Sequence, residues 1–310
     1  MMRRLAAAAC LLTTLSSAHA GLVNLTAMSG GANIYTNGNF TAPSSDVEGA
    51  LIAGGNVNLA SYSVNDVNRD AFGEPGYALV VRGNLTLNGG SINNGKAYVG
   101  GTSTLTHAAA PAMSAQNPVD FDAATAYYKA MAGKLSQVAS TGSVSKLWSG
   151  VVVKGGGQGG VDVFNVDAAM FATSSSWTLQ QLTAGQTLIF NVGGSVGTFN
   201  AGGIDFSPLS GYNVLFNFFE ASNVNLKGVI GSVLAPYAAV TANWGVINGN
   251  VVVDSWNSTI QVNANHYFKP VELAGYDAPA AANAVPEPGS IALLLAGLGM
   301  LGLIRRRRNS

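Results

Sequence analysis

The sequence predicts a mainly β fold: a single-domain parallel β-solenoid, or β-helix, with one long α-helix packed on its side. Three observations predict it. Glycine-anchored segments recur at a nearly constant spacing along the chain, apolar and polar side chains alternate within them, and glycine accounts for 39 of the 310 residues. One segment follows a helical period instead. An N-terminal signal peptide and a C-terminal transmembrane tail are expected to flank this body.

Four related segments carry the repeat: GNFTA at Gly38, GNVNL at Gly55, GNLTL at Gly83 and GTSTL at Gly101. The steps between their starts are 17, 28 and 18. The long step contains the polar, turn-rich stretch NDVNRDAFGE (65–74), which we expect to be a loop inserted in one coil. A second register, with two equal steps of 17, links Gly211, Gly228 and Gly245.

Within these segments residues of one kind recur at the same position. One parity holds mostly apolar residues: Phe40, Val57, Leu85 and Ser103, then Ala42, Leu59, Leu87 and Leu105. The other parity is polar: Asn39, Asn56, Asn84 and Thr102, then Thr41, Asn58, Thr86 and Thr104. Period two indicates strands with the apolar columns buried and the polar columns facing out. A coil of this length is too short for a strand and a crossover helix, but fits short strands stacked ~4.8 Å apart.

Glycine and asparagine are expected at the corners of each coil because both accept positive φ. The dipeptide NG recurs at Asn37, Asn94 and Asn248. Because NG also marks hairpins, an antiparallel sandwich is the alternative fold. Hairpins alone do not predict matching columns at a fixed period, so the solenoid is preferred.

The segment NPVDFDAATAYYKAMAGKLSQVAS predicts a helix over about 119–139. Apolar residues recur every three or four positions from Phe121 to Val138. Asp120 and Asp122 stand at its start, where the helix dipole favours negative charge. The apolar stripe is expected to pack against the side of the solenoid.

The start of the chain, 1–20, reads as a signal peptide. Arg3 and Arg4 precede a short apolar core, and small residues predict cleavage by signal peptidase between Ala20 and Gly21. The chain's one cysteine, Cys10, lies inside this segment, so no disulfide is expected in the exported protein. A lipoprotein acylated at Cys10 is a weaker alternative, because cleavage there would leave too short an apolar core.

Charge excludes one class of partner. Residues 21–285 contain nine Lys and Arg against 14 Asp and Glu, a net charge of −5. A mildly acidic body without a basic stripe argues against nucleic-acid binding.

Two glycine-rich motifs suggest chemistry that their contexts do not support. Gly155–Gly160 satisfies G-x-G-x-x-G, but a strand-like segment follows where a dinucleotide site needs a helix. Gly193–Gly197 matches the nucleophile elbow around Ser195, again without a following helix. We therefore expect no catalytic and no cofactor-binding residues, and the protein is expected not to be an enzyme.

Acidic residues are scattered, and no His or Cys spacing predicts a metal site. The densest charged set is Asp66 and Asp70 with Arg69, in the expected loop. Asp46 and Glu48, in the sequence DVEG, are read as bridging a corner of the coil. Clustered carboxylates would be needed for the alternative function, a polysaccharide-active enzyme on a β-helix.

The C-terminus combines three elements in order: Pro286, Glu287 and Pro288, an apolar span of about 289–304, and four arginines, Arg305, Arg306, Arg307 and Arg308. This tail resembles the PEP-CTERM sorting signal of Gram-negative bacteria. The resemblance implies an exosortase that cleaves near the Pro-Glu-Pro site after a transient, inner-membrane-tethered stage. The protein would then reach the cell surface or extracellular matrix.

The body (21–270, followed by a linker, 271–285, and the sorting signal, 286–308) resembles a choice-of-anchor A domain. The resemblance rests on SSDVEGALIAGGNVNL, PVDFDAA and GSVLAPYAAVTANWGVINGNVVV. It implies no established activity. The sequence thus favours an exported, non-catalytic structural or adhesive protein, with exopolysaccharide or other matrix proteins as partners. Ice or ordered-surface binding is a weaker alternative: outward Thr and Asn columns resemble those of ice-binding proteins, but mixed Asn and Thr ladders are also ordinary solenoid surface.

Overall fold

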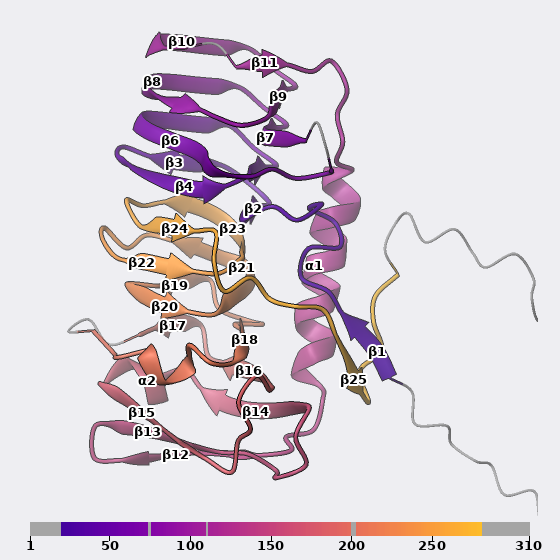
Figure 1. The fold of residues 1–310 in the computed structure, drawn as a ribbon, viewed down its shortest axis with the longest axis vertical. Coiled ribbons are helices and arrows are strands. Elements are labelled where there is room, and N and C mark those ends of the chain that lie inside the picture. The colour runs from indigo at the N-terminus through magenta and orange to yellow at the C-terminus, as the bar shows by residue number, and fades with distance from the viewer. Residues whose placement is uncertain (1–19, 74–75, 110, 200–202, 281–310) are drawn as a thin grey trace, which may run out of the picture.

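The computed structural model describes residues 20–73, 76–109, 111–199 and 203–280, which form a mainly β body with one long helix (Figure 1). The first part of the chain contributes β1 (Ala20–Val23), β2 (Ile34–Thr36), β3 (Phe40–Ala42), β4 (Ser45–Gly49), β5 (Leu51–Ala53), β6 (Val57–Arg69), β7 (Tyr77–Val81), β8 (Leu85–Ile92), β9 (Lys96–Val99), β10 (Ser103–Ala108) and β11 (Ala112–Met113).

The helices are α1 (Phe121–Ser136), α2 (Ala169–Ala172) and the 3-10 turn η1 (Ser207–Leu209). The rest of the chain contributes β12 (Ser143–Leu147), β13 (Gly150–Lys154), β14 (Val161–Asp167), β15 (Ser176–Gln180), β16 (Thr187–Gly193), β17 (Val196–Thr198), β18 (Asn213–Asn217), β19 (Asn223–Asn225), β20 (Gly228–Ile230), β21 (Ser232–Val240), β22 (Val246–Asn248), β23 (Val251–Asn257), β24 (Gln261–Asn263) and β25 (Val271–Ala274). The predictions of a mainly β chain and of one long helix are confirmed.

The largest sheet has 20 strands, and its strand pairs are parallel. Among the described residues, antiparallel pairing is confined to β1 with β25, β12 with β13, and a bridge between Ala71 and Tyr77. The antiparallel sandwich considered from the sequence therefore does not describe this chain.

The strand layers are not stacked in the order of the sequence. β2 pairs with β5 on one side and with β23 on the other, so the described chain enters the stack in its middle. It continues through β5, β7 and β9 to β11 at one end. α1 then runs along the side of the stack, and the second part of the chain builds from β14 through β16, β18 and β21 back to β23 (Figure 1).

The pairing register confirms the columns predicted from the sequence. Phe40 pairs with Val57, Val57 with Leu85, and Leu85 with Ser103. Phe40, Val57 and Leu85 are at most 1% exposed. Ser103 is exposed, because it lies in β10 at the end of the stack.

The glycines that anchor the repeat serve close packing, and the expectation that they supply positive φ is wrong. A Cβ on Gly55, Gly83 or Gly101 would lie 2.2 to 2.4 Å from the side-chain oxygen of an asparagine in the preceding coil. None of the three has positive φ, whereas Gly249 and Asn94 do. The glycine is needed because the coils approach each other at this corner.

The extra residues in the 28-residue step of the repeat do not form one simple loop. Val47 pairs with Val64, Gly49 with Arg69 and Leu51 with Leu79, so the pairing offset grows in two stages. The first increase is a bulge within β6, where Asn65 and Asn68 have positive φ. β6 therefore extends through half of the segment expected to be a loop, and carries Arg69 at its end.

The second register expected from the sequence is met only in part. Leu215 of β18 pairs with Ser232 of β21, which repeats the expected step of 17. Gly228 of β20 pairs with Val246 of β22, so Gly245 lies one residue out of register.

One set of strands is buried on both faces. Ile34 and Leu51 point into the core between the strand layers, whereas Tyr35, Ile52 and Val80 belong to a second core that includes α1. This two-sided burial explains the continuous apolar runs of β5, β7 and β23.

α1 is close to its predicted bounds and is fixed at both ends. The Asp120 carboxylate accepts a hydrogen bond from the Ala123 backbone N–H at 3.0 Å, which caps the first turn. Near the other end, Asn191 donates to the Leu135 carbonyl at 2.7 Å and Asn217 to the Ala132 carbonyl at 3.0 Å. These asparagines come from neighbouring strands and tie the helix to the sheet.

The two ends of the described chain meet. β1 pairs antiparallel with β25, so the segment expected as a linker, 271–285, begins with a strand. The cleavage site predicted between Ala20 and Gly21 lies within β1. Residues 1–19 and the sorting signal lie outside the described residues, as does the span 289–304, and no helix in the described ranges is long and apolar enough to cross a membrane.

Candidate functional site: a polar column and a groove

The outer columns differ in how their polar atoms are used. In the first column, the side-chain oxygens of Asn39, Asn56 and Asn84 each accept the backbone N–H of the next coil at 2.8 Å. These amides satisfy corner backbone groups that the strand pairing leaves free. This column is therefore structural.

The second column keeps its polar atoms free. Thr41 pairs with Asn58, Asn58 with Thr86, and Thr86 with Thr104. Thr41 is half-buried and the other three are exposed. None of these four side chains hydrogen-bonds to another group in the described part of the chain, so their hydroxyls and amide are available to a ligand or to water.

The second column continues through the other half of the molecule. Asn257 pairs with Thr41, and Thr198 pairs with Asn225. Thr241 is placed between them by the neighbouring pairs of Val240 with Val224 and with Trp256. We call the eight residues of this row the polar column: Thr198, Asn225, Thr241, Asn257, Thr41, Asn58, Thr86 and Thr104.

The polar column has a fixed geometry because its residues lie on adjacent parallel strands. Such strands repeat at about 4.8 Å, so the hydroxyl and amide groups form a regular row. A regular row of donors and acceptors can bind a repetitive surface, such as a polysaccharide chain or ordered water. The sequence indicated half of this row. The other half was missed because β23 and β3 are neighbours in space but lie far apart along the chain.

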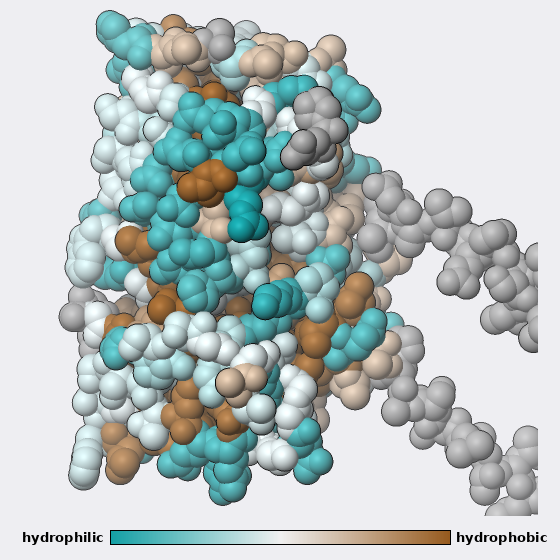
Figure 2. Space-filling model, viewed as in Figure 1, coloured by the Kyte–Doolittle hydropathy of each residue, from teal (hydrophilic) through white to brown (hydrophobic). Residues whose placement is uncertain are grey.

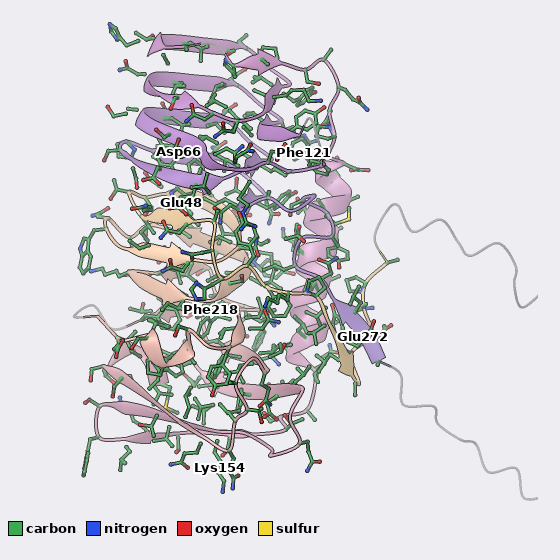
Figure 3. The ribbon with its side chains drawn as sticks, viewed as in Figure 1. Glu48, Asp66, Phe121, Lys154, Phe218 and Glu272 are labelled. Atoms are coloured by element: carbon green, nitrogen blue, oxygen red, sulfur yellow. The ribbon has the colours of Figure 1, made fainter. Side chains whose placement is uncertain are left out.

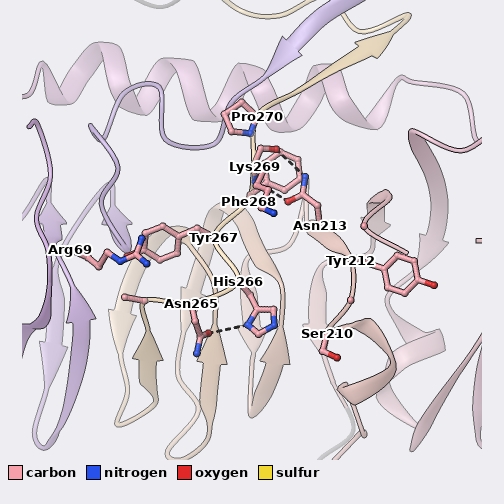
Figure 4. Close-up of a pocket in the computed structure, with 13 residues that line it drawn as sticks. Arg69, Ser210, Tyr212, Asn213, Asn265, His266, Tyr267, Phe268, Lys269 and Pro270 are labelled. Atoms are coloured by element: carbon pink, nitrogen blue, oxygen red, sulfur yellow. Dashed lines mark hydrogen bonds between the residues drawn. The ribbon is translucent and has the colours of Figure 1, made fainter. Parts of the chain in front are cut away.

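A groove of about 540 Å³ lies on another part of the surface, where 264–270 passes the corner at 210–213 (Figure 4). Basic residues in it are Arg69, His266 and Lys269, and no Asp or Glu lines it. His266 lies between Arg69 on one side and Ser210 on the other (Figure 4). The sequence did not predict this site, because its residues come from distant segments.

Segment 264–270 forms one wall of the groove and is held in place by hydrogen bonds. Asn213 accepts from the Lys269 N–H at 2.8 Å and donates to the Lys269 carbonyl at 2.9 Å. Asn250 accepts from the Phe268 N–H at 3.0 Å. The Glu48 carboxylate accepts from the Ala264 N–H at 2.8 Å. The segment is therefore fixed in position by contacts with β18, β4 and the turn between β22 and β23.

The motif DVEG is explained by this wall. Glu48 holds Ala264, which agrees with a bridging role. A Cβ on Gly49 would lie 2.5 Å from the Tyr267 hydroxyl, so glycine leaves room for that side chain. Burial raises the pKa of Tyr267 well above its usual value. Arg69 covers the same ring, with its guanidinium carbon 5.8 Å from the ring centroid.

The carboxylates singled out in the sequence are partly brought together. Glu48 and Asp66 lie on the same side of the stack (Figure 3). Burial, and then the charges of Asp66 and Glu48, raise the pKa of Asp46. None of the three lines the groove of Figure 4. Among the described residues, no group of three or more His, Cys, Asp or Glu side chains could hold a metal ion.

The two glycine motifs have structural partners. Gly156 N–H donates to the buried Asp162 carboxylate at 3.2 Å, and β14 follows the motif. At the second motif, Ser195 is exposed and β17 follows. The imidazoles of His107 and His266 contact Asn88 and Asn265, not Ser195. The strands that follow these motifs agree with the sequence prediction.

Figure 2 shows polar side chains gathered over the face that bears β4, β22 and β24, with single apolar residues between them. Fold and surface together define a repetitive β protein with regular rows of polar side chains. The chain belongs to the family described as a putative ice-binding-like adhesive domain, whose model matches residues 26–264. The PEP-CTERM protein-sorting motif matches residues 284–308.

These matches confirm the resemblance to a choice-of-anchor A domain with a PEP-CTERM signal. The sorting motif implies export and processing by an exosortase-type enzyme. No curated protein matches the chain. Among solved structures, an ice-binding protein from the Antarctic ascomycete Antarctomyces psychrotrophicus is 17% identical and has a TM-score of 0.28, with 81% of this chain and 98% of that chain covered.

Proposed function

We propose that this is an exported, non-catalytic adhesive protein of the cell surface or extracellular matrix, with a parallel β-solenoid body. Signal peptidase would remove residues 1–20. The C-terminal tail would hold the protein briefly in the inner membrane until an exosortase cleaves near Pro286. The polar column would then bind exopolysaccharide or another matrix component.

The polar column is the observation that carries this proposal. Its exposed Asn58, Thr86 and Thr104 make no hydrogen bonds within the described protein, although the adjacent asparagine column is fully used in structure. Elsewhere in the column Thr241 hydrogen-bonds to a neighbouring asparagine and the amide oxygen of Asn225 is buried, so the free groups are those at the Asn58 to Thr104 end. Unused donors and acceptors are costly for folding only where they are buried, and these face solvent. They are therefore free to act in binding, which agrees with the adhesive description of the family.

A binding experiment tests the column directly. The full-length protein and its Asn58→Lys/Thr86→Lys variant are compared for binding to matrix isolated from the producing cells. Two added lysines block the row and remove two to three hydrogen bonds, so we expect affinity to fall about tenfold or more. Thr178→Lys, on an exposed strand of another sheet, is the matched control and should bind normally. Equal binding by all three proteins would overturn the proposal.

Ice or ordered-surface binding is a second candidate, favoured by the regular spacing of Thr and Asn side chains on adjacent parallel strands of the column. If it is correct, the protein will produce thermal hysteresis or slow ice recrystallisation, and Thr86→Lys will abolish the effect. A wild-type protein without either activity would exclude this candidate and leave adhesion standing.

A further inference from the structure

We propose that the groove of Figure 4 is a binding site for an acidic oligosaccharide, whose uronate carboxylates would be held by Arg69, His266 and Lys269. The proposal rests on the proposed function, since an exported matrix protein meets such polymers. It adds a second site, away from the polar column, and names the chemical class of its ligand.

The charge of the groove is opposite to that of the body. Residues 21–285 carry five more acidic than basic side chains, yet three basic side chains and no carboxylate line this groove. All three basic side chains are exposed. A concave site that gathers one sign of charge raises the local concentration of ligands of the opposite sign.

The basic groups of the groove form no ion pair with another residue that the structure describes. Arg82 and Lys134 each form an ion pair with an aspartate, at 2.6 and 2.7 Å. Within the described ranges, Arg69, His266 and Lys269 form none. Glu48, whose carboxylate is bound to the Ala264 N–H, does not line the groove. The cationic groups are therefore available for charge-assisted hydrogen bonds to a ligand.

The groove is built before any ligand arrives. The Asn213 side chain hydrogen-bonds to both the N–H and the carbonyl of Lys269, and the Asn250 side chain accepts the Phe268 N–H. The Asn65 side chain accepts the Arg69 N–H at 2.7 Å and so fixes the end of the β6 insertion beside the groove. A preformed site loses less conformational entropy on binding.

The groove also has the size and the uncharged groups that a sugar needs. Its volume of about 540 Å³ lies within the range of small-molecule sites, which is about 300–1,000 Å³. Tyr212 and Ser210 line one side, and the Ser210 hydroxyl can hydrogen-bond to a hydroxyl group of the sugar.

Calorimetry tests the proposal, with the full-length protein and a hexamer of galacturonate as the probe. Wild-type protein should bind the hexamer, and Arg69→Gln and Lys269→Gln should each weaken binding by about tenfold, as expected for the loss of a charge-assisted contact. Lys154→Gln is the matched control, because Lys154 is exposed at the far end of the stack (Figure 3) and should leave binding unchanged. Thermal melting of each variant verifies that it is folded.

Two further ligands identify the chemistry. A neutral hexasaccharide should bind at least about tenfold more weakly, and inorganic phosphate should not compete at the same concentration as the hexamer. Phosphate that competes equally would mean a simple anion site and overturn the saccharide assignment. Hexamer binding that is unaffected by both groove variants, or no hexamer binding, would overturn the inference. The Asn58→Lys/Thr86→Lys variant separates this result from the proposed function: it should bind the hexamer normally while losing matrix binding.

Discussion

Many asparagine side chains of this body, both buried and exposed, satisfy backbone groups of neighbouring segments. Asn191 and Asn217 do so for the helix, and Asn39 and Asn56 do so at a corner. Tyr62 is different. Its ring is fully buried against Phe40, and its hydroxyl has no hydrogen-bond partner among the described protein groups. An unpartnered buried hydroxyl destabilises the folded state by about 1–3 kcal/mol, because its hydrogen bonds to water are lost and not replaced.

Tyr62→Phe should therefore raise stability at pH 7, by up to about 1–3 kcal/mol, because it removes this penalty. A second effect should appear at high pH. Burial, and then the charge of Asp46, raise the pKa of Tyr62 well above 10.0 in the folded protein. Above pH 10 the unfolded chain loses its phenolic proton and the folded one retains it, so stability falls as pH rises. Denaturant unfolding at pH 8 and pH 11 should show a smaller loss for Tyr62→Phe than for wild type. An equal loss in both proteins would show that this hydroxyl titrates normally when folded.

At the scale of the strand, the alternation of apolar and polar residues predicted which residues pair between neighbouring strands. The apolar and polar columns from Phe40 to Thr104 were predicted with the observed register, because side-chain direction in a strand has a period of two. The helix was predictable for a similar reason, since its apolar residues follow a period near 3.6. The bulge at Asn65 was not predictable, because it depends on how β6 pairs with β4.

The column gives a sharp stability contrast between adjacent residues of β8. Leu85→Asp places a carboxylate among buried aliphatic side chains, which costs at least several kcal/mol unless the group protonates. Thr86→Asp faces solvent and should change stability by about 0.5 kcal/mol or less. Thermal unfolding of the two proteins measures the difference. Val57→Asp and Asn58→Asp should repeat the contrast one coil earlier, and similar melting of Leu85→Asp and Thr86→Asp would contradict the burial pattern.

At the scale of the whole molecule, the order of the layers could not be predicted. The sequence repeat places Gly38 before Gly55 but does not show that β2 also pairs with β23. That contact depends on α1, which spans the stack and lets the chain resume at its other end (Figure 1). The polar column crosses from β23 to β3, and the groove combines Arg69 with residues from the second part of the chain. The candidate sites could therefore be predicted only in part from the sequence.

The described chain begins and ends at one edge of the body. Ala20 pairs with Ala274, so the first and last described strands form one two-stranded sheet. This sheet lies at the outer side of α1, away from the polar strands (Figure 1). The polar column is therefore remote from this sheet, whereas the groove adjoins it, because Pro270 directly precedes β25.

The sorting motif gives the last prediction. Replacing Pro286, Glu287 and Pro288 together with alanine should leave an unprocessed protein in the membrane. The apolar span 289–304 and Arg305 to Arg308 would still stop transfer, since a charged cluster after an apolar span holds it in place, while the element recognised by the exosortase would be lost. Cell fractionation and the mass of the product measure the result. Asn283→Ala, just outside the matched motif, is the control and should be processed normally. Normal release of the triple-alanine protein would show that the tail is not read as a sorting signal.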